Sequence, residues 1–146
     1  MKYFIYKVKD ESGRTLSGVQ QAENKNDVKR KVSKGKYYFI SAVSISKEKL
    51  FSKSVTFETL IMFTHRLTTL IEAGIPILQA MTILWRQTEE ETIQVVISYM
   101  RSELEEGNRI SSALSKFPKI FPVVYTALIK VGEASGALPQ VLRKLS

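Results

Sequence analysis

The stretch TEEETIQVVISYMRSELEEG (88–107) carries the clearest structural pattern in the chain. Its apolar side chains recur at positions i, i+3, i+4, i+7 and i+11, which places them on one face of an α-helix. This stripe consists of Ile93, Val96, Ile97, Met100 and Leu104. Three glutamates near its start favour the positive end of a helix dipole, and Gly107 is suited to end the helix. The pattern therefore predicts an amphipathic helix with one buried face.

The same helical period continues on both sides of this stretch and predicts further helices between residues 56 and 146. They are expected over residues 57–73, 76–87, 109–116, 122–132 and 138–145. Thr56 can cap the first of them, and Gly74 can end it. The links between the helices are short, so the sequence predicts a six-helix antiparallel bundle.

Two of these helices have wide apolar faces that we expect to be buried. The face of the helix over 57–73 consists of Phe57, Leu60, Ile61, Thr64, Leu67, Leu70 and Ile71. The face of the helix opened by Pro122 includes Val124, Tyr125, Leu128 and Ile129. Both sets recur with helical spacing, which predicts that they point into the bundle.

Residues 1–45 have a different pattern. Aromatic and β-branched runs predict strands over 3–8, 15–22 and 37–45, with a short helix over 27–34 after the second strand. Gly18 inside the second strand indicates a β-bulge or the close approach of another backbone. A module of about 45 residues has too small a core to be stable alone, so we expect it to pack on another part of the protein.

Residues 46–55 are polar, basic and serine-rich, and we interpret them as a linker. The sequence thus predicts a mainly α chain: a small basic β-β-α-β module over 1–45, the linker, and a six-helix domain over 56–146. Because the linker carries few apolar residues to hold the two parts together, the helical domain is expected to fold without the module.

The net charge of +8 is concentrated at one end of the chain. Residues 1–55 hold 13 Lys and Arg against 5 Asp and Glu, whereas residues 56–146 hold 9 of each. The predicted basic surface consists of Lys29, Arg30, Lys31, Lys34 and Lys36. Such a surface suits an anionic membrane or an acidic partner protein. An ordinary lysine-rich solvated surface is the alternative.

A basic nucleic-acid-binding module is the alternative from another functional class. It rests on aromatic residues close to lysines, a pattern typical of single-strand binding. These aromatic residues are Tyr3, Tyr6, Tyr37, Tyr38 and Phe39. The same side chains are needed for the core of the module, so no nucleic acid is expected as a partner.

The sequence lacks the residue constellations that are typical of catalytic and metal sites. The chain has no cysteine and one histidine, His65, which we interpret as an ordinary surface residue. It also lacks a GxxxxGK[ST] phosphate loop and an apolar run long enough to span a membrane. The sequence therefore predicts no catalytic, cofactor or metal site, and a protein that is not an enzyme.

The motif GEASG (132–136) places a carboxylate near the end of a helix, where the helix dipole opposes a negative charge. Glu133 could be paired, could cap the start of a neighbouring helix, or could contact a partner outside the chain. Gly132 and Gly136 could serve only close helix packing and a turn. These alternatives stay open at the level of sequence.

Three motifs together closely resemble the first repeat of the inner-membrane platform proteins of type II secretion and type IV pilus systems. They are FTHRLTTLIEAGIPILQAM (63–81), EGNRISSALSKFPKIFP (106–122) and GEASGALPQVLRKLS (132–146). The family's N-terminal pattern is matched by Phe4, Tyr6, Asp10, Gly13, Gly18 and Ala22. Two departures are His65-Arg66 in place of the commoner Arg-Gln pair, and Val131 in place of alanine.

The resemblance implies a role that composition cannot reveal. Members of the family are polytopic membrane proteins with two related cytoplasmic helical domains. This chain would be the N-terminal module and the first such domain, and a membrane span would follow. It would be a docking scaffold that couples an assembly ATPase to filament growth. Implied partners are the ATPase, other inner-membrane subunits, the anionic membrane surface and a possible second copy. The candidate partner-binding residues are Gly132, Glu133, Gly136 and Arg66.

Overall fold

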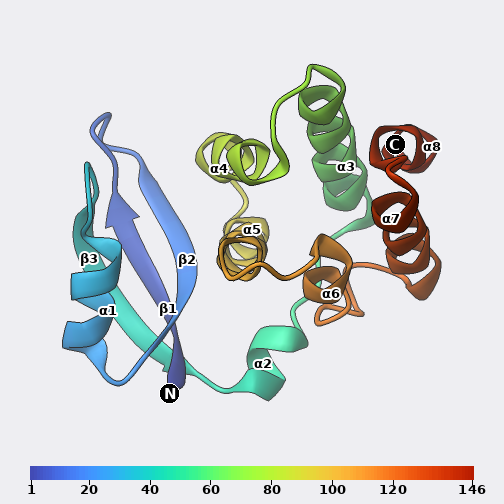
Figure 1. Cartoon of the computed structure of the whole chain (residues 1–146). Helices are drawn as coiled ribbons and strands as arrows, with labels where there is room; N and C mark the ends of the chain where they lie inside the picture. Colours follow the sequence, from blue (N-terminus) through green and yellow to red (C-terminus); the bar gives the residue numbers. More distant parts are fainter.

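The computed structural model describes residues 1–146, with a three-stranded sheet at one end and helices over the rest (Figure 1). The elements in chain order are β1 (Lys2–Lys9), β2 (Thr15–Ala22), α1 (Lys25–Val32), β3 (Tyr38–Ile45), α2 (Lys47–Phe51), α3 (Phe57–Glu72), α4 (Ile77–Gln87), α5 (Glu91–Glu105), α6 (Ile110–Leu114), α7 (Val123–Ser135) and α8 (Leu138–Leu145). The mainly α fold and the N-terminal β-β-α-β module are confirmed. Helices α3–α8 are the six that the sequence predicts after residue 56.

The sheet has β1 at its centre, with β2 and β3 antiparallel on either side. The register between β1 and β2 is continuous, and Tyr6 lies opposite Gly18. The one irregularity falls between β1 and β3, at Lys7 and Val8. The predicted bulge at Gly18 is therefore absent. Helix α1 packs on the sheet and buries Val28 completely.

The outer edge of β2 is covered by side chains of the helical domain. The backbone N–H of Ser17 donates to Gln94 Oε1 at 3.0 Å, and Trp85 Nε1 donates to the Ser17 carbonyl at 2.7 Å. The Val19 N–H donates to Ser98 Oγ at 3.0 Å. An uncovered edge strand leaves such backbone groups unpaired, so these bonds fasten the module directly to α4 and α5.

Gly18 lies at the centre of this contact. A Cβ on Gly18 would overlap the Tyr6 ring and would lie 2.7 Å from Ser98 Oγ. The close approach that the sequence predicts is therefore made by two side chains and not by another backbone. Only glycine lets β2 lie this close to α5.

Residues 47–51, which we expected within a linker, form the short helix α2. Its start is capped by Ser46, whose Oγ accepts the Lys49 N–H at 3.2 Å. Leu50 is fully buried, and the Phe51 ring packs 5.4 Å from the Tyr99 ring. We expected an unstructured linker here, whereas the structure has a helix. Its two apolar residues, Leu50 and Phe51, are enough to anchor the segment to the hydrophobic core. The domain boundaries at residues 45 and 56 stay predictions.

Buried side chains of both parts form one hydrophobic cluster, which runs from the sheet through α5 to α8. Leu16 of the module, Ile97 of α5 and Leu142 of α8 all belong to it. The linker is thus not the main connection between module and helical domain. Our reason for expecting an independently folding helical domain is wrong, because β2 packs on α5.

Helix α5 lies at the centre of the fold, where it contacts β2, α4 and α6 (Figure 1). The predicted stripe is confirmed: four of its side chains are buried and Leu104 is half-buried. Every residue from Ile93 to Met100 is buried, including the polar Gln94 and Ser98. This middle part of the helix is buried on all sides because β2 covers the face that the sequence pattern leaves polar.

Four side chains that we expected in the core are exposed instead. Phe57 and Ile61 of α3 are 74% and 41% exposed, and Val124 and Leu128 of α7 are 68% and 39% exposed. Periodicity identifies side chains that share a helix face, but it does not reveal whether another element covers that face.

Candidate functional site

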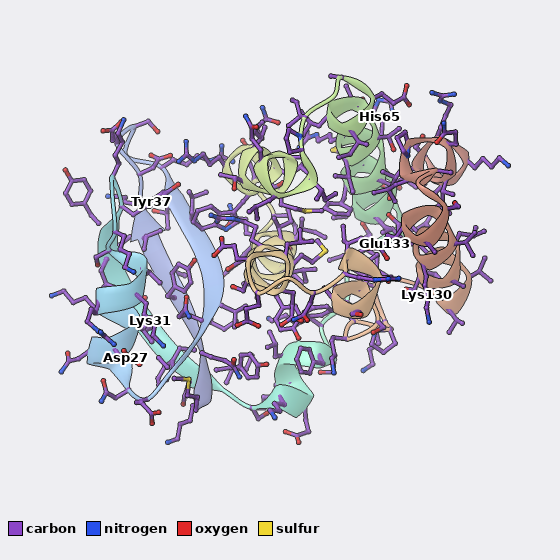
Figure 2. The ribbon with its side chains drawn as sticks, viewed as in Figure 1. Asp27, Lys31, Tyr37, His65, Lys130 and Glu133 are labelled. Atoms are coloured by element: carbon purple, nitrogen blue, oxygen red, sulfur yellow. The ribbon has the colours of Figure 1, made fainter.

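The predicted site residues fall in three separate places. Glu133 and its neighbouring glycines lie where α6, α7 and α8 meet, and Arg66 lies on α3. Figure 2 shows Glu133 at the opposite end of the molecule from Asp27 and Lys31 of α1. The structure therefore does not gather these residues into one site.

The Glu133 carboxylate caps the start of α6. Its Oε2 accepts the Ile110 N–H at 2.8 Å, and its Oε1 accepts the Ser111 N–H at 3.3 Å. Helix α6 has no side-chain cap of its own, because Arg109 occupies its N-cap position. The sequence leaves several roles open for Glu133. The structure shows one of them, the capping of a neighbouring helix.

The glycines beside Glu133 serve packing and a turn. A Cβ on Gly132 would lie 3.1 Å from Val141 Cγ2 and 3.2 Å from Leu138 Cα, so α8 approaches α7 closely here. Gly136 has φ 72°, in the left-handed region that favours glycine, and its N–H donates to the Gly132 carbonyl. Residues 132–136 thus fix the positions of three helices. Contact with a partner at this motif stays a prediction.

Arg66 lines a cavity of about 440 Å³ between α3 and the loop that joins α4 to α5. Glu58, Glu89 and Glu90 also line this cavity, together with the exposed Met62. None of the four charged groups lies within 4.0 Å of an opposite charge. We call this cavity the Arg66 groove. The sequence suggests a solvated helix start at Glu89 and Glu90, and it contains no local signal that they line the same cavity as Arg66. The Glu90 carboxylate also caps α5, because it accepts the N–H groups of Thr92 and Ile93.

The predicted basic surface, which lies on α1 and just after it, is partly neutralised. Arg30 and Lys31 both form ion pairs with Asp27. Hydrogen bonds from the Arg30 guanidinium and the Glu23 backbone N–H lower the pKa of the Asp27 carboxyl to about 2. Two further predicted cations, Lys29 and Lys34, have no ionic partner within 4.0 Å.

Lys36, the fifth predicted cation, lies 3.5 Å from Glu11. Both side chains are largely exposed, so the pair is screened by solvent and contributes little to stability. The free positive charge of this surface is therefore smaller than the sequence suggests, and it centres on Lys29 and Lys34.

Most aromatic side chains near the lysines are used in packing. Tyr6 is buried, and the Tyr3 ring packs 5.9 Å from the Phe51 ring. The Tyr37 ring packs 5.6 Å from Trp85, and its hydroxyl accepts a hydrogen bond from Arg86. Tyr38 is largely exposed, at 68%. A row of free rings for base stacking is thus not present on the module.

Helices in this chain are either too short or too polar to cross a membrane. No three or more His, Asp or Glu side chains are grouped so that they could hold a metal ion. The sole histidine, His65, is exposed on α3.

The fold defines a class of helical protein in which a small β-module is packed on the central helix of a six-helix domain. A family model described as type II secretion system (T2SS), protein F, matches residues 63–146. This match covers more than half of the chain, so the chain belongs to the family of type II secretion system protein F.

Individual relatives extend the similarity over the N-terminal module. The type IV pilus assembly protein PilC of Thermus thermophilus is 30% identical over 100% of this chain. The PilC protein of Myxococcus xanthus is 26% identical over 98% of it, and the type II secretion system protein F of Vibrio cholerae is 26% identical over 100%. The chain spans 36–38% of the length of these three relatives.

Proposed function

We propose that this chain is a cytoplasmic docking and scaffold domain of an inner-membrane platform protein. In this role it couples an assembly ATPase to the assembly of pilin or pseudopilin filaments. The observation that carries the proposal is membership of the family. Relatives that align over nearly the whole chain are named for type IV pilus assembly and type II secretion, which supports it.

The packing supports a mechanical role. A domain that transmits force must move as one body, and one hydrophobic cluster runs through module and helical domain here. Hydrogen bonds that join β2 to Trp85, Gln94 and Ser98 add directional restraints at the joint. A push on the module would therefore be transmitted to α5 without an intervening flexible segment.

Two surfaces are candidates for the ATPase or another subunit. Lys29 on α1 and Lys34 just after it offer unpaired positive charge to an acidic protein surface. The Arg66 groove offers a concave surface with unpaired charges and the exposed side chain of Met62. Gly132, Glu133 and Gly136 would act on docking indirectly, because they set the positions of α6, α7 and α8.

The proposal is tested by measuring binding of the purified chain to the assembly ATPase of the same organism. We expect Lys29→Glu with Lys34→Glu, or Arg66→Glu, to weaken binding by about tenfold or more, because truncated or reversed interface charges typically have effects of this size. Lys49→Glu on α2 is the matched control, since Lys49 is exposed and has no ionic partner. Absence of any ATPase binding by the unaltered chain would contradict the proposal.

A further inference from the structure

Helix α7 is apolar on its exposed side as well as on its buried side. Tyr125, Ile129 and Gly132 are its buried residues. The exposed apolar residues are Val123 at 83%, Val124 at 68%, Ala127, Leu128 at 39% and Val131 at 60%. We call these five residues the α7 stripe. Exposed apolar side chains that gather on one side of a helix mark a surface that another structure covers.

The segment that contains α7 and its sequence neighbours is strongly basic. Residues 107–146 contain six Lys and Arg and a single carboxylate, Glu133. That carboxylate is engaged by the amides at the start of α6. Four lysines have no ionic partner within 4.0 Å: Lys116, Lys119, Lys130 and Lys144. An apolar stripe bordered by free lysines matches an apolar medium with a negatively charged surface.

The composition of the α7 stripe distinguishes among the possible occupants. Protein interfaces draw most of their binding energy from Trp, Tyr and Arg anchors, whereas this stripe has only Val, Leu and Ala. A second copy of the same face would bring unpaired lysines together without carboxylates to balance them, which is unfavourable. A helix that combines an apolar face with lysines beside it is suited to lie in a lipid interface, and α7 carries Lys130 beside the stripe.

We propose that the α7 stripe lies on the surface of an anionic lipid bilayer, with Val124, Leu128 and Val131 in the boundary between headgroups and acyl chains. Lys130 and Lys144 then contact lipid phosphates. This contact is peripheral, because α7 has 13 residues and does not cross the bilayer.

The proposal also gives the domain an orientation. Figure 1 shows α7 and α8 at the opposite end of the molecule from α1 and the sheet. In Figure 2, Lys130 lies far from Asp27 and Lys31. With the α7 stripe on the bilayer, the cations of α1 face away from the lipid and are free for a protein partner. The lipid contact goes beyond the docking role and needs no ATPase for its test.

The test uses the complete chain with vesicles of equal parts phosphatidylcholine and phosphatidylglycerol, and with vesicles of phosphatidylcholine alone. We expect flotation with the anionic vesicles only. Val124→Glu combined with Val131→Glu should reduce the bound fraction at least about tenfold, because it removes two apolar contacts and adds two negative charges. Both positions are exposed, so the melting temperature of this variant should change little.

Lys29→Gln combined with Lys34→Gln is the matched control, since it lowers the net charge by the same two units at the far end of the molecule. It should retain most of the binding. The chain contains no cysteine, so Val131→Cys and Lys29→Cys each provide a single site for an environment-sensitive fluorophore. A blue shift with anionic vesicles is expected at position 131 and not at position 29.

Three results would each overturn the proposal. One is the absence of vesicle binding by the unaltered chain. Another is an equal loss of binding in the control, which would place the contact at α1. The third is a concentration-dependent dimer that shields position 131 without vesicles, which would make a second copy the occupant.

Discussion

Removal of the Glu133 carboxylate should destabilise the chain through α6. Glu133→Ala leaves the backbone N–H groups of Ile110 and Ser111 without their acceptor, and Arg109 offers no substitute cap. A hydrogen bond to a charged group contributes about 1.5–3 kcal/mol, and the loss of a helix cap costs about 0.5–2 kcal/mol. These ranges describe the same contact, so we expect a loss of about 2 kcal/mol.

Glu133→Gln keeps one carbonyl acceptor and the shape of the side chain but removes the charge. We therefore expect a smaller loss of about 1 kcal/mol. For a chain of this length, 1 kcal/mol shifts the melting temperature by about 2–4 °C. Thermal and urea unfolding measure both losses, with Glu106→Gln as the control because its carboxylate caps nothing. If both Glu133 variants unfolded within a degree of the unaltered chain, the capping argument would be wrong.

Four further changes test the packing. Ile97→Asp buries a carboxylate in the centre of α5 and should cost about 3–5 kcal/mol in urea unfolding; a shift of the melting temperature by a degree or two would show that this face is not buried. Gly18→Ala overlaps side chains at the joint and should cost about 1–3 kcal/mol, whereas an unchanged melting temperature would mean that β2 is not held against α5. Deletion of residues 1–45 uncovers α5, so the remainder should lose its sharp thermal transition; an unaltered transition would support a separate helical domain. The pKa of Asp27 is lowered from 3.8 to about 2, so its contribution to stability is present above pH 3.8 and is lost as the pH falls towards 2; Asp27→Asn should make stability less sensitive to pH in that window, and an identical acid titration would contradict the pairing.

The helical part of the fold was predictable because its residues obey local rules. The stripe from Ile93 to Leu104 has the helical period, and Gly74, Gly107 and Gly136 end helices with positive φ. Helix α2 was not predictable from such rules, since its five residues include only Leu50 and Phe51 as apolar side chains. Its order comes from contacts with rings that lie far away in the sequence.

The candidate sites were less predictable because they depend on contacts between distant segments. Glu133 caps a helix that begins 23 residues earlier in the chain, a separation for which no local pattern exists. The exposure of Val124 and Leu128 could not be predicted from periodicity either. The pattern shows which side chains share a helix face, but not whether another element packs against that face. The charge count likewise overstates the α1 surface, where Asp27 neutralises Arg30 and Lys31.

Hydrogen–deuterium exchange of the chain, with and without the assembly ATPase, tests the docking role most directly. Our account predicts slower exchange in a localised region, at α1 or around the Arg66 groove, with the interior of α5 unchanged because it is already protected. Exchange along α7 should be unchanged by the ATPase and should slow with anionic vesicles. Unchanged exchange over α1 and α3 at saturating ATPase would contradict the claim that this chain is the docking domain.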